Sequence, residues 1–72
     1  MLKLGKYQHF KGAYYQVLHI AKDSETEEEI VVYQPLYDDQ QGERHIWVRP
    51  LTNFSQMIER EGKITTRFSY IE

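Results

Sequence analysis

The stretch IVVYQPLY (residues 30–37) is the clearest strand in the sequence, because its β-branched and aromatic residues are typical of a β-strand. A similar stretch, YYQVLHIA (residues 14–21), precedes it, and only the polar segment KDSETEEE separates the two. This connection is too short to contain a crossover helix, so the two strands are expected to pair as antiparallel neighbours. The sequence therefore predicts a domain built around an antiparallel sheet.

Shorter strands are expected on both sides of this pair. YQHF (residues 7–10) precedes it and ends in a turn at Lys11-Gly12-Ala13, while HIWVR (residues 45–49) and KITTRFSYI (residues 63–71) follow it. Pro35 within the central stretch indicates an edge or bulged segment, because proline cannot donate to a strand ladder.

One helix is expected before the last strand. Asn53 and Gln56 have the spacing of a capping box, and Phe54, Met57 and Ile58 follow at helical spacing, which predicts a helix of about two turns. Gly62 then stands where a glycine commonly ends a helix, and Met57 is expected to fill the core.

This order of elements predicts a mostly β fold and a single domain over residues 1–72. Either a small bent antiparallel sheet or an SH3-like barrel satisfies it, with about five strands and one short helix before the last strand. A chain of 72 residues buries only about 60% of the surface that it exposes when unfolded, so the core is small. The aromatic residues, 14% of the chain, are expected to supply much of it.

The composition also limits location and chemistry. The chain has no cysteine, which excludes disulfides and thiolate-bound zinc and fits a reducing compartment. We expect a cytoplasmic protein, because no stretch resembles a signal peptide and none is long and apolar enough to span a membrane.

The charge is uneven along the chain. The net charge is −2, with lysines alone in residues 1–22 and acids alone in residues 23–43. The acidic segment is most simply a solvated hairpin. Nucleic-acid binding is not favoured, because it normally requires a basic excess on one face.

Strand alternation divides the side chains between two faces. One set is aliphatic and is expected to form the core: Ile30, Val32, Leu36, Ile46 and Val48. The other set is aromatic and basic: Tyr33, Tyr37, Trp47, Arg49 and, from the last strand, Arg67. So much aromatic area on one sheet face must be covered, either by another part of the chain or by a partner.

The motifs HFKG, SET, VVYQ-x-LY, WVRP and RF occur in an order and at spacings that resemble the bacterial family known as domain of unknown function 1653. The resemblance extends from about Tyr7 to Phe68. It implies a small, mostly β domain and no particular activity.

The candidate site residues are all on or near the aromatic face. An arginine fork beside aromatic rings can grip a carboxylate or phosphate while the rings stack on the ligand. Alternatively, Arg49 and Arg67 pair with Glu25 or Glu29 and stack on Trp47, in which case their role is structural. The ligand-binding hypothesis comprises Tyr33, Tyr37, Trp47, Arg49, Arg67 and His9.

No catalytic residue, metal site or cofactor is expected. The three histidines lack the spacing of metal ligands, and no serine lies in a nucleophile motif. The leading hypothesis is therefore a non-catalytic module that binds a peptide or small anionic ligand. The alternatives are an assembly module that uses the same face for a homodimer or for docking on a larger protein, and weak nucleic-acid binding.

Overall fold

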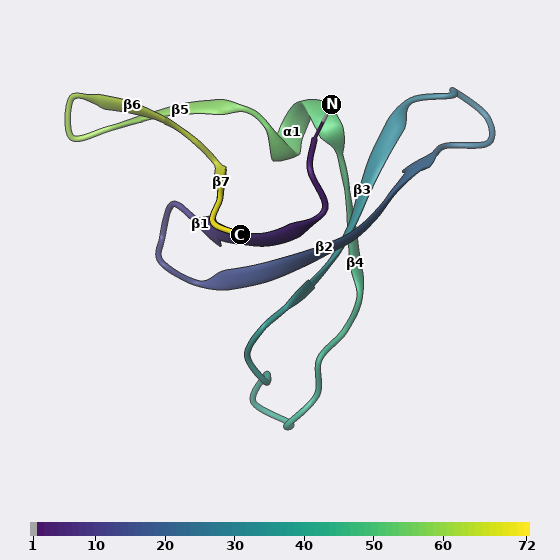
Figure 1. Cartoon of the computed structure of the whole chain (residues 1–72), viewed down its shortest axis with the longest axis horizontal. Coiled ribbons are helices and arrows are strands. Elements are labelled where there is room, and N and C mark those ends of the chain that lie inside the picture. The colour runs from purple at the N-terminus through teal and green to yellow at the C-terminus, as the bar shows by residue number, and fades with distance from the viewer. Residues whose placement is uncertain (1) are drawn as a thin grey trace.

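The computed structural model describes residues 2–72 and contains seven strands and one helical turn (Figure 1). Their bounds are β1 (Gly5–His9), β2 (Tyr14–Lys22), β3 (Glu29–Pro35), β4 (Trp47–Pro50), α1 (Leu51–Phe54), β5 (Met57–Arg60), β6 (Lys63–Thr66) and β7 (Phe68–Tyr70). Within these residues no helix has the length and apolar character to cross a bilayer.

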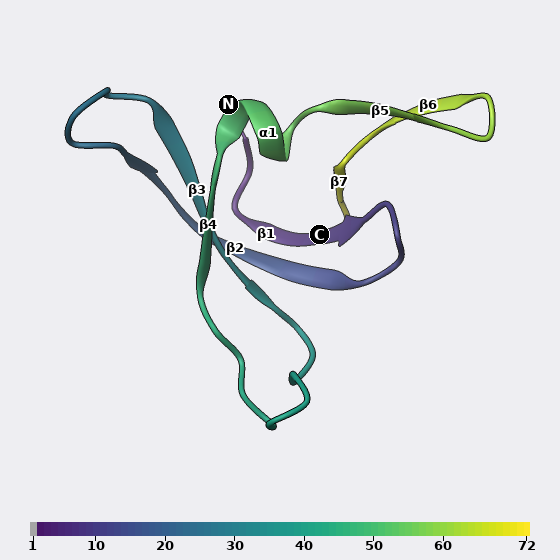
Figure 2. The same ribbon diagram turned by 180° about the vertical axis from the view of Figure 1, so that it is seen from behind.

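Five strands form one open antiparallel sheet in the order β4-β3-β2-β1-β7, and β5 pairs only with β6. The expected pairing of residues 14–21 with residues 30–37 is confirmed as β2 against β3. Figures 1 and 2 show three arms that point in different directions: the β2–β3 turn, the β3–β4 loop and the β5–β6 hairpin. The fold is the bent antiparallel sheet, without closure into an SH3-like barrel.

The core lies on the aromatic face of the sheet, so the expected aliphatic core is wrong. The buried hydrophobic residues are Tyr7, Val17, Val31, Tyr33, Phe54 and Phe68. By contrast, Ile46 is 60% exposed and Val48 is 65% exposed, and Leu36 is also on the surface. The division of side chains between two faces was correct, but the inner and outer faces were reversed.

Two remote aromatic residues cover this face. Phe54 from α1 and Phe68 from β7 stack with ring centroids 4.1 Å apart and planes 1° from parallel. Both rings also contact Tyr33 edge to face, at 5.6 Å in each case. Because large rings fill more volume per residue than aliphatic side chains, a chain this short can build a dense core from a few of them.

A bulge in β2 sets which of its residues face the core. Val17 is opposite Tyr33, whereas His19 is opposite Val32, so the register shifts around Leu18. The extra residue reverses the alternation, as a β-bulge does. Ile20 therefore packs against the same core as Val17.

A short helix before the last strands is confirmed, but the two-turn helix predicted to follow Asn53 is wrong in place and length. The helix is the single turn α1, and the amide of Ser55 donates to the carbonyl oxygen of Leu51 to end it. Asn53 lies inside this turn and does not cap it. Met57, expected in the core, starts β5 and is 60% exposed.

The segment after α1 forms a hairpin instead. Glu61 and Gly62 both have positive φ, 54° and 79°, and they join β5 to β6 as a two-residue loop. Positive φ at both positions is the signature of a type I′ turn, whose twist matches that of the flanking strands. Gly62 is thus a hairpin glycine and not the end of a helix.

The expected last strand is divided at Arg67. The amide of Arg67 donates to the carbonyl oxygen of Gln56, and its own carbonyl oxygen accepts from the amide of Phe10. The chain therefore leaves the small hairpin at this residue and joins the main sheet beside β1 as β7. This crossing brings Arg67 next to α1 and the end of β1.

Candidate functional site

Arg49 and Arg67 are half-buried and share one neighbour, Asn53 of α1. Nη1 of Arg49 donates to Oδ1 of Asn53 at 2.6 Å, and Nε of Arg67 donates to the Asn53 carbonyl oxygen at 3.2 Å. Arg49 comes from β4 and Arg67 from the link between β6 and β7. The fold therefore brings together two guanidinium groups that are 18 positions apart in the sequence.

The other partners of both guanidinium groups are also neutral. Nε of Arg49 donates to the Tyr33 hydroxyl at 3.1 Å, and Nη2 of Arg67 donates to Oε1 of Gln56 at 2.8 Å. Among residues 2–72, neither arginine forms an ion pair with a carboxylate. The expected pairing with Glu25 or Glu29 is therefore wrong, and so is stacking on Trp47.

Aromatic rings lie against this cationic pair. The guanidinium carbon of Arg49 is 5.4 Å from the centroid of Phe68 and 6.0 Å from that of Tyr33. Cation–π contacts of this kind stabilise a partly desolvated arginine and fix its direction. The arginines, Asn53 and these rings form what we call the arginine site.

His9 lies beside the arginine site at the end of β1. Its ring is 4.8 Å from Phe68 and 4.5 Å from Phe10, centroid to centroid. The backbone N–H of Lys11 donates to its Nδ1 at 3.1 Å, so the neutral ring carries its proton on Nε2. Burial, reinforced by the charges of Arg49, Arg67 and Lys11, holds the pKa of His9 below its ordinary value.

A pair of tyrosines borders the site on the β2 side. The hydroxyls of Tyr15 and Tyr37 are 3.0 Å apart, and Tyr15 also contacts Tyr33 and Phe68 edge to face. Burial and the hydrogen bond with Tyr37 raise the pKa of Tyr15 to about 12. Tyr15 therefore stays neutral. Tyr37 is the solvent-exposed member of the pair, with 46% of its surface exposed.

Trp47 shares the inner face with the site but is not part of its packed interior. It pairs with Tyr33 across β3 and β4, and its indole is 53% exposed. Its ring contact is with His45, 6.2 Å away centroid to centroid, in the loop just before β4. Of the predicted residues, the structure thus brings His9, Tyr33, Arg49 and Arg67 together and places Tyr37 and Trp47 near the margin.

Sequence reasoning missed Asn53, Tyr15 and Gln56 as members of this site. The spacing of Asn53 and Gln56 fits a capping box, in which their side-chain oxygens would accept backbone N–H groups and not guanidinium groups. The sequence shows only that Asn53 and Gln56 are polar residues in a polar segment, TNFSQ. Such a pattern does not identify the partner of an arginine.

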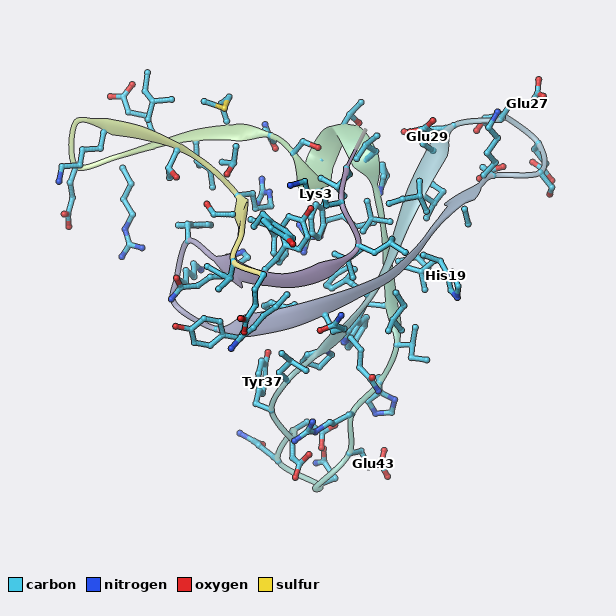
Figure 3. The ribbon with its side chains drawn as sticks, viewed as in Figure 1. Lys3, His19, Glu27, Glu29, Tyr37 and Glu43 are labelled. Carbon is cyan, nitrogen blue, oxygen red and sulfur yellow. The ribbon has the colours of Figure 1, made fainter. Side chains whose placement is uncertain are left out.

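The acidic segments lie away from the arginine site. Figure 3 shows Glu27 and Glu29 at the β2–β3 turn and Glu43 in the β3–β4 loop, far from β1 and β7. In that loop Asp39, Glu43 and His45 gather, with one possible ligand atom of each lying within 4.8 Å of the others. The Asp39 Oδ1 already accepts the backbone N–H groups of Gln41 and Glu43, so this cluster organises the loop.

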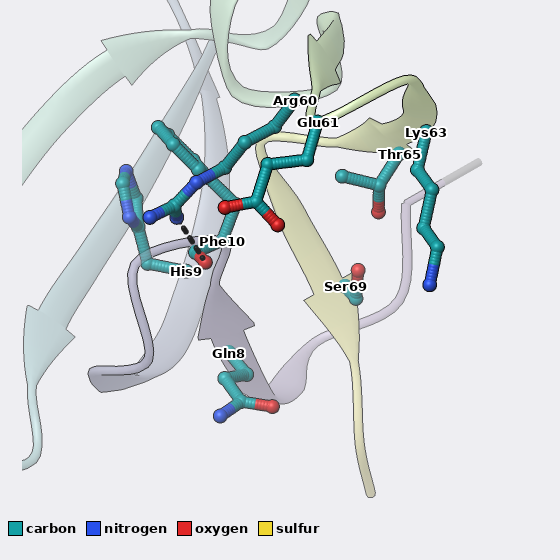
Figure 4. A pocket seen from close by; sticks show the side chains of 8 residues that line it. All are labelled: Gln8, His9, Phe10, Arg60, Glu61, Lys63, Thr65 and Ser69. Carbon is teal, nitrogen blue, oxygen red and sulfur yellow. Dashed lines mark hydrogen bonds between the residues drawn. The ribbon is translucent and has the colours of Figure 1, made fainter.

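A cleft of about 420 Å³ adjoins the site at His9 and Phe10 (Figure 4). The β5–β6 hairpin forms its other wall with Arg60, Glu61 and Lys63. Arg60 links the two walls, because its Nη1 donates to the Phe10 carbonyl oxygen at 3.3 Å (Figure 4). The cleft has a mixed polar and apolar lining and carries both signs of charge.

The chain is a small open β-sheet domain with a cationic, aromatic-lined candidate site at its surface. The chain belongs to the family described as protein of unknown function (DUF1653), whose model matches residues 5–70. A crystal structure of a protein of this family from Bordetella bronchiseptica is similar to it, with a TM-score of 0.86 and 30% sequence identity over 97% of this chain and 87% of that one. No curated protein matches the chain.

Proposed function

We propose that this chain is a non-catalytic binding module in which Arg49 and Arg67 recognise an anionic group of a peptide or small molecule. One observation carries this proposal: two half-buried guanidinium groups lie together with only neutral hydrogen-bond partners among residues 2–72. Partial burial of a charge without a counter-charge costs free energy that neutral acceptors offset only in part. An anionic ligand supplies the missing charge.

The surrounding rings suit the remainder of such a ligand. Tyr37 and Trp47 expose aromatic surface on the same side as the arginines, where they can contact an apolar part of the bound molecule. Binding sites commonly combine apolar walls with a few oriented polar groups, and this site has that composition.

The chemistry of the site supports binding without catalysis. Histidine is the residue type best suited to proton transfer near neutral pH, but His9 beside the site has a lowered pKa, and Nδ1 of that ring already accepts the Lys11 amide. Tyr15 remains protonated because its pKa is raised to about 12. The site thus provides donors for an anion and no activated nucleophile.

Heteronuclear NMR tests this function. Citrate, benzoate and phenyl phosphate are added separately to the labelled protein, to Arg49→Gln, to Arg67→Gln and to a control, Arg44→Gln, whose exposed arginine pairs with Asp38. We expect the His9, Tyr33 and Asn53 amides to shift in the parent protein and in the control. We also expect dissociation constants to rise at least about ten-fold in either site variant, because a charge-assisted bond is lost. If no anion moves these amides, or if the control weakens binding equally, the proposal is wrong.

The second candidate is assembly through β4. This strand is at the edge of the sheet, and Ile46, Trp47 and Val48 beside and within it are 60%, 53% and 65% exposed. An exposed apolar edge strand favours pairing with another strand. Sedimentation velocity over a wide concentration range tests this: a dimer that Val48→Lys disrupts supports it, and a monomer at all concentrations excludes self-assembly.

A further inference from the structure

The arginine site carries two positive charges that no carboxylate among residues 2–72 neutralises. A carboxylate ligand would balance one of them. A phosphate monoester has a charge of about −1.5 to −2 at neutral pH and would balance both. We infer that the group recognised at this site is a phosphate monoester; this inference rests on the function proposed above and specifies its ligand.

The donors that remain on the two guanidinium groups fit such a ligand. The Nε–H group of each arginine already donates a hydrogen bond: that of Arg49 to the Tyr33 hydroxyl, and that of Arg67 to the Asn53 carbonyl oxygen. In addition, Nη1 of Arg49 donates to Oδ1 of Asn53, and Nη2 of Arg67 donates to Oε1 of Gln56. Nη2 of Arg49 and Nη1 of Arg67 have no acceptor among the residues described.

A planar carboxylate is best held by one arginine fork through two parallel bonds, which commonly use Nε. In both arginines the Nε–H group already donates to a protein oxygen. The group left for a ligand is therefore a terminal nitrogen: Nη2 of Arg49 and Nη1 of Arg67. Two separate guanidinium ends, held by one shared residue, can each take a different oxygen of a phosphoryl group. A group with several terminal oxygens makes better use of this arrangement than a single carboxylate does.

His9 adds a third donor from a different strand. Its Nδ1 is occupied, so its Nε2–H is the side of the ring that is available to a ligand. The charged groups around this ring are Arg49 from β4, Arg67 from the link before β7, Lys11 from the β1–β2 turn and, across the adjoining cleft, Arg60 and Glu61 of the β5–β6 hairpin; β2 presents only the neutral Tyr15. A dianion here would reduce the repulsion that these cations exert on a protonated His9.

The phosphate can belong to a phosphorylated side chain of a peptide or to a phosphorylated small molecule. Both carry the same terminal group, and the exposed rings of Tyr37 and Trp47 can contact either. Separate probes therefore distinguish the two sources.

Calorimetric titration at about pH 7.5 compares phenyl phosphate, a dianion, with phenyl sulfate and benzoate, which are monoanions of tetrahedral and planar shape. We expect phenyl phosphate to bind at least about ten-fold more tightly than either monoanion. Arg49→Gln and Arg67→Gln should each abolish this preference, while Arg44→Gln keeps it. Arg49→Lys, which retains the charge, provides a milder variant if the glutamine variants fold poorly.

A phosphoserine peptide and a nucleoside monophosphate are then compared, and the tighter of the two identifies the source of the phosphate. If the three phenyl compounds bind equally, the phosphate inference is overturned while anion binding stands. If none of them binds, both proposals fail.

Discussion

Arg49 and Tyr33 are linked side by side on neighbouring strands: Nε of Arg49 donates to the Tyr33 hydroxyl at 3.1 Å, and the guanidinium carbon lies 6.0 Å from the Tyr33 ring centroid. Their strands pair directly, and Tyr33 is buried beneath the arginine. The core tyrosine therefore sets the direction of a charged side chain at the surface, which couples the packing of the fold to the candidate site.

Removing only the Tyr33 hydroxyl should disturb the site more than the core. In Tyr33→Phe the ring still packs on Phe54 and Phe68, but the Arg49 Nε loses its acceptor. We expect a stability loss of about 1–2 kcal/mol, because a hydrogen bond to a charged group is removed. Anion affinity should also fall, as measured by NMR titration together with urea denaturation.

The control for this variant is Tyr37→Phe. It removes an exposed hydroxyl whose partner is Tyr15, not an arginine. Equal effects of the two variants on anion affinity would show that the Tyr33 hydroxyl has no special role in orienting Arg49.

Phe54 should be one of the most sensitive core positions. It is fully buried and stacks on Phe68, so Phe54→Ala should cost about 3–5 kcal/mol, a large share of the stability of a domain this small. Met57→Ala, in the exposed hairpin, should cost less than about 1 kcal/mol. Urea melts of the two variants measure this difference, and similar losses would contradict the observed core.

Gly5 should not tolerate a side chain. Its φ is +134°, and a Cβ there would lie 2.6 Å from the carbonyl oxygen of Glu72, which accepts the Lys6 amide. Gly5→Ala should therefore both strain the backbone and displace the C-terminal residues from β1.

Gly12→Ala is the matched control, because Gly12 also has positive φ, +110°, but open space where a Cβ would be. We expect both substitutions to be destabilising and Gly5→Ala to be worse by at least about 1 kcal/mol, as steric displacement adds to the backbone strain. Thermal melts test this, and equal losses would argue against the close approach of Glu72.

His9 should make the protein less stable in mild acid. Its folded-state pKa is below 6.5, owing to burial and then to Arg49, Arg67 and Lys11. As the pH falls through about 6.5, the unfolded chain takes up a proton before the folded chain does. The free energy of unfolding therefore decreases from that pH down to the lowered pKa, and this contribution is constant at lower pH.

The variant His9→Gln removes this dependence, whereas His19 and His45 are present in both proteins. Urea midpoints at about pH 7.5 and pH 5.5 should differ more for the parent protein than for His9→Gln. The same difference in both proteins would mean that His9 titrates normally.

The sequence predicted which side chains share a face but not which face is buried. Alternation places Trp47 and Arg49 on the side of Tyr33, and the register confirms it. What covers that side is Phe54 and Phe68, which reach it from remote segments. Local periodicity carries no information on such a long-range contact, so the more aliphatic face was mistaken for the core.

The helix predicted after Asn53 was wrong for a different reason. Asn53, Gln56 and Gly62 fit helix-end rules, and the same residues fit a turn followed by a hairpin. The two-residue loop at Glu61 and Gly62, flanked by Ile58 and Ile64, was the signal for the hairpin. The candidate site was predicted by residue type at four positions, and one of them, Tyr33, is also a hydrogen-bond partner of Arg49. The other partners, Asn53 and Gln56, lie in the segment that the sequence predicts as a helix, so they could not be assigned to the arginines.

The Nε–Hε NMR signals of Arg49 and Arg67 report directly on whether these two arginines bind an anion. In free protein, Arg49 and Arg67 should show slowly exchanging Nε–Hε groups, because both are hydrogen bonded inside the site, and phenyl phosphate should shift both signals. Arg44, in an exposed ion pair with Asp38, should not respond. If Arg49 and Arg67 stay unchanged, or if Arg44 moves as far as they do, the two arginines do not form an anion-binding site.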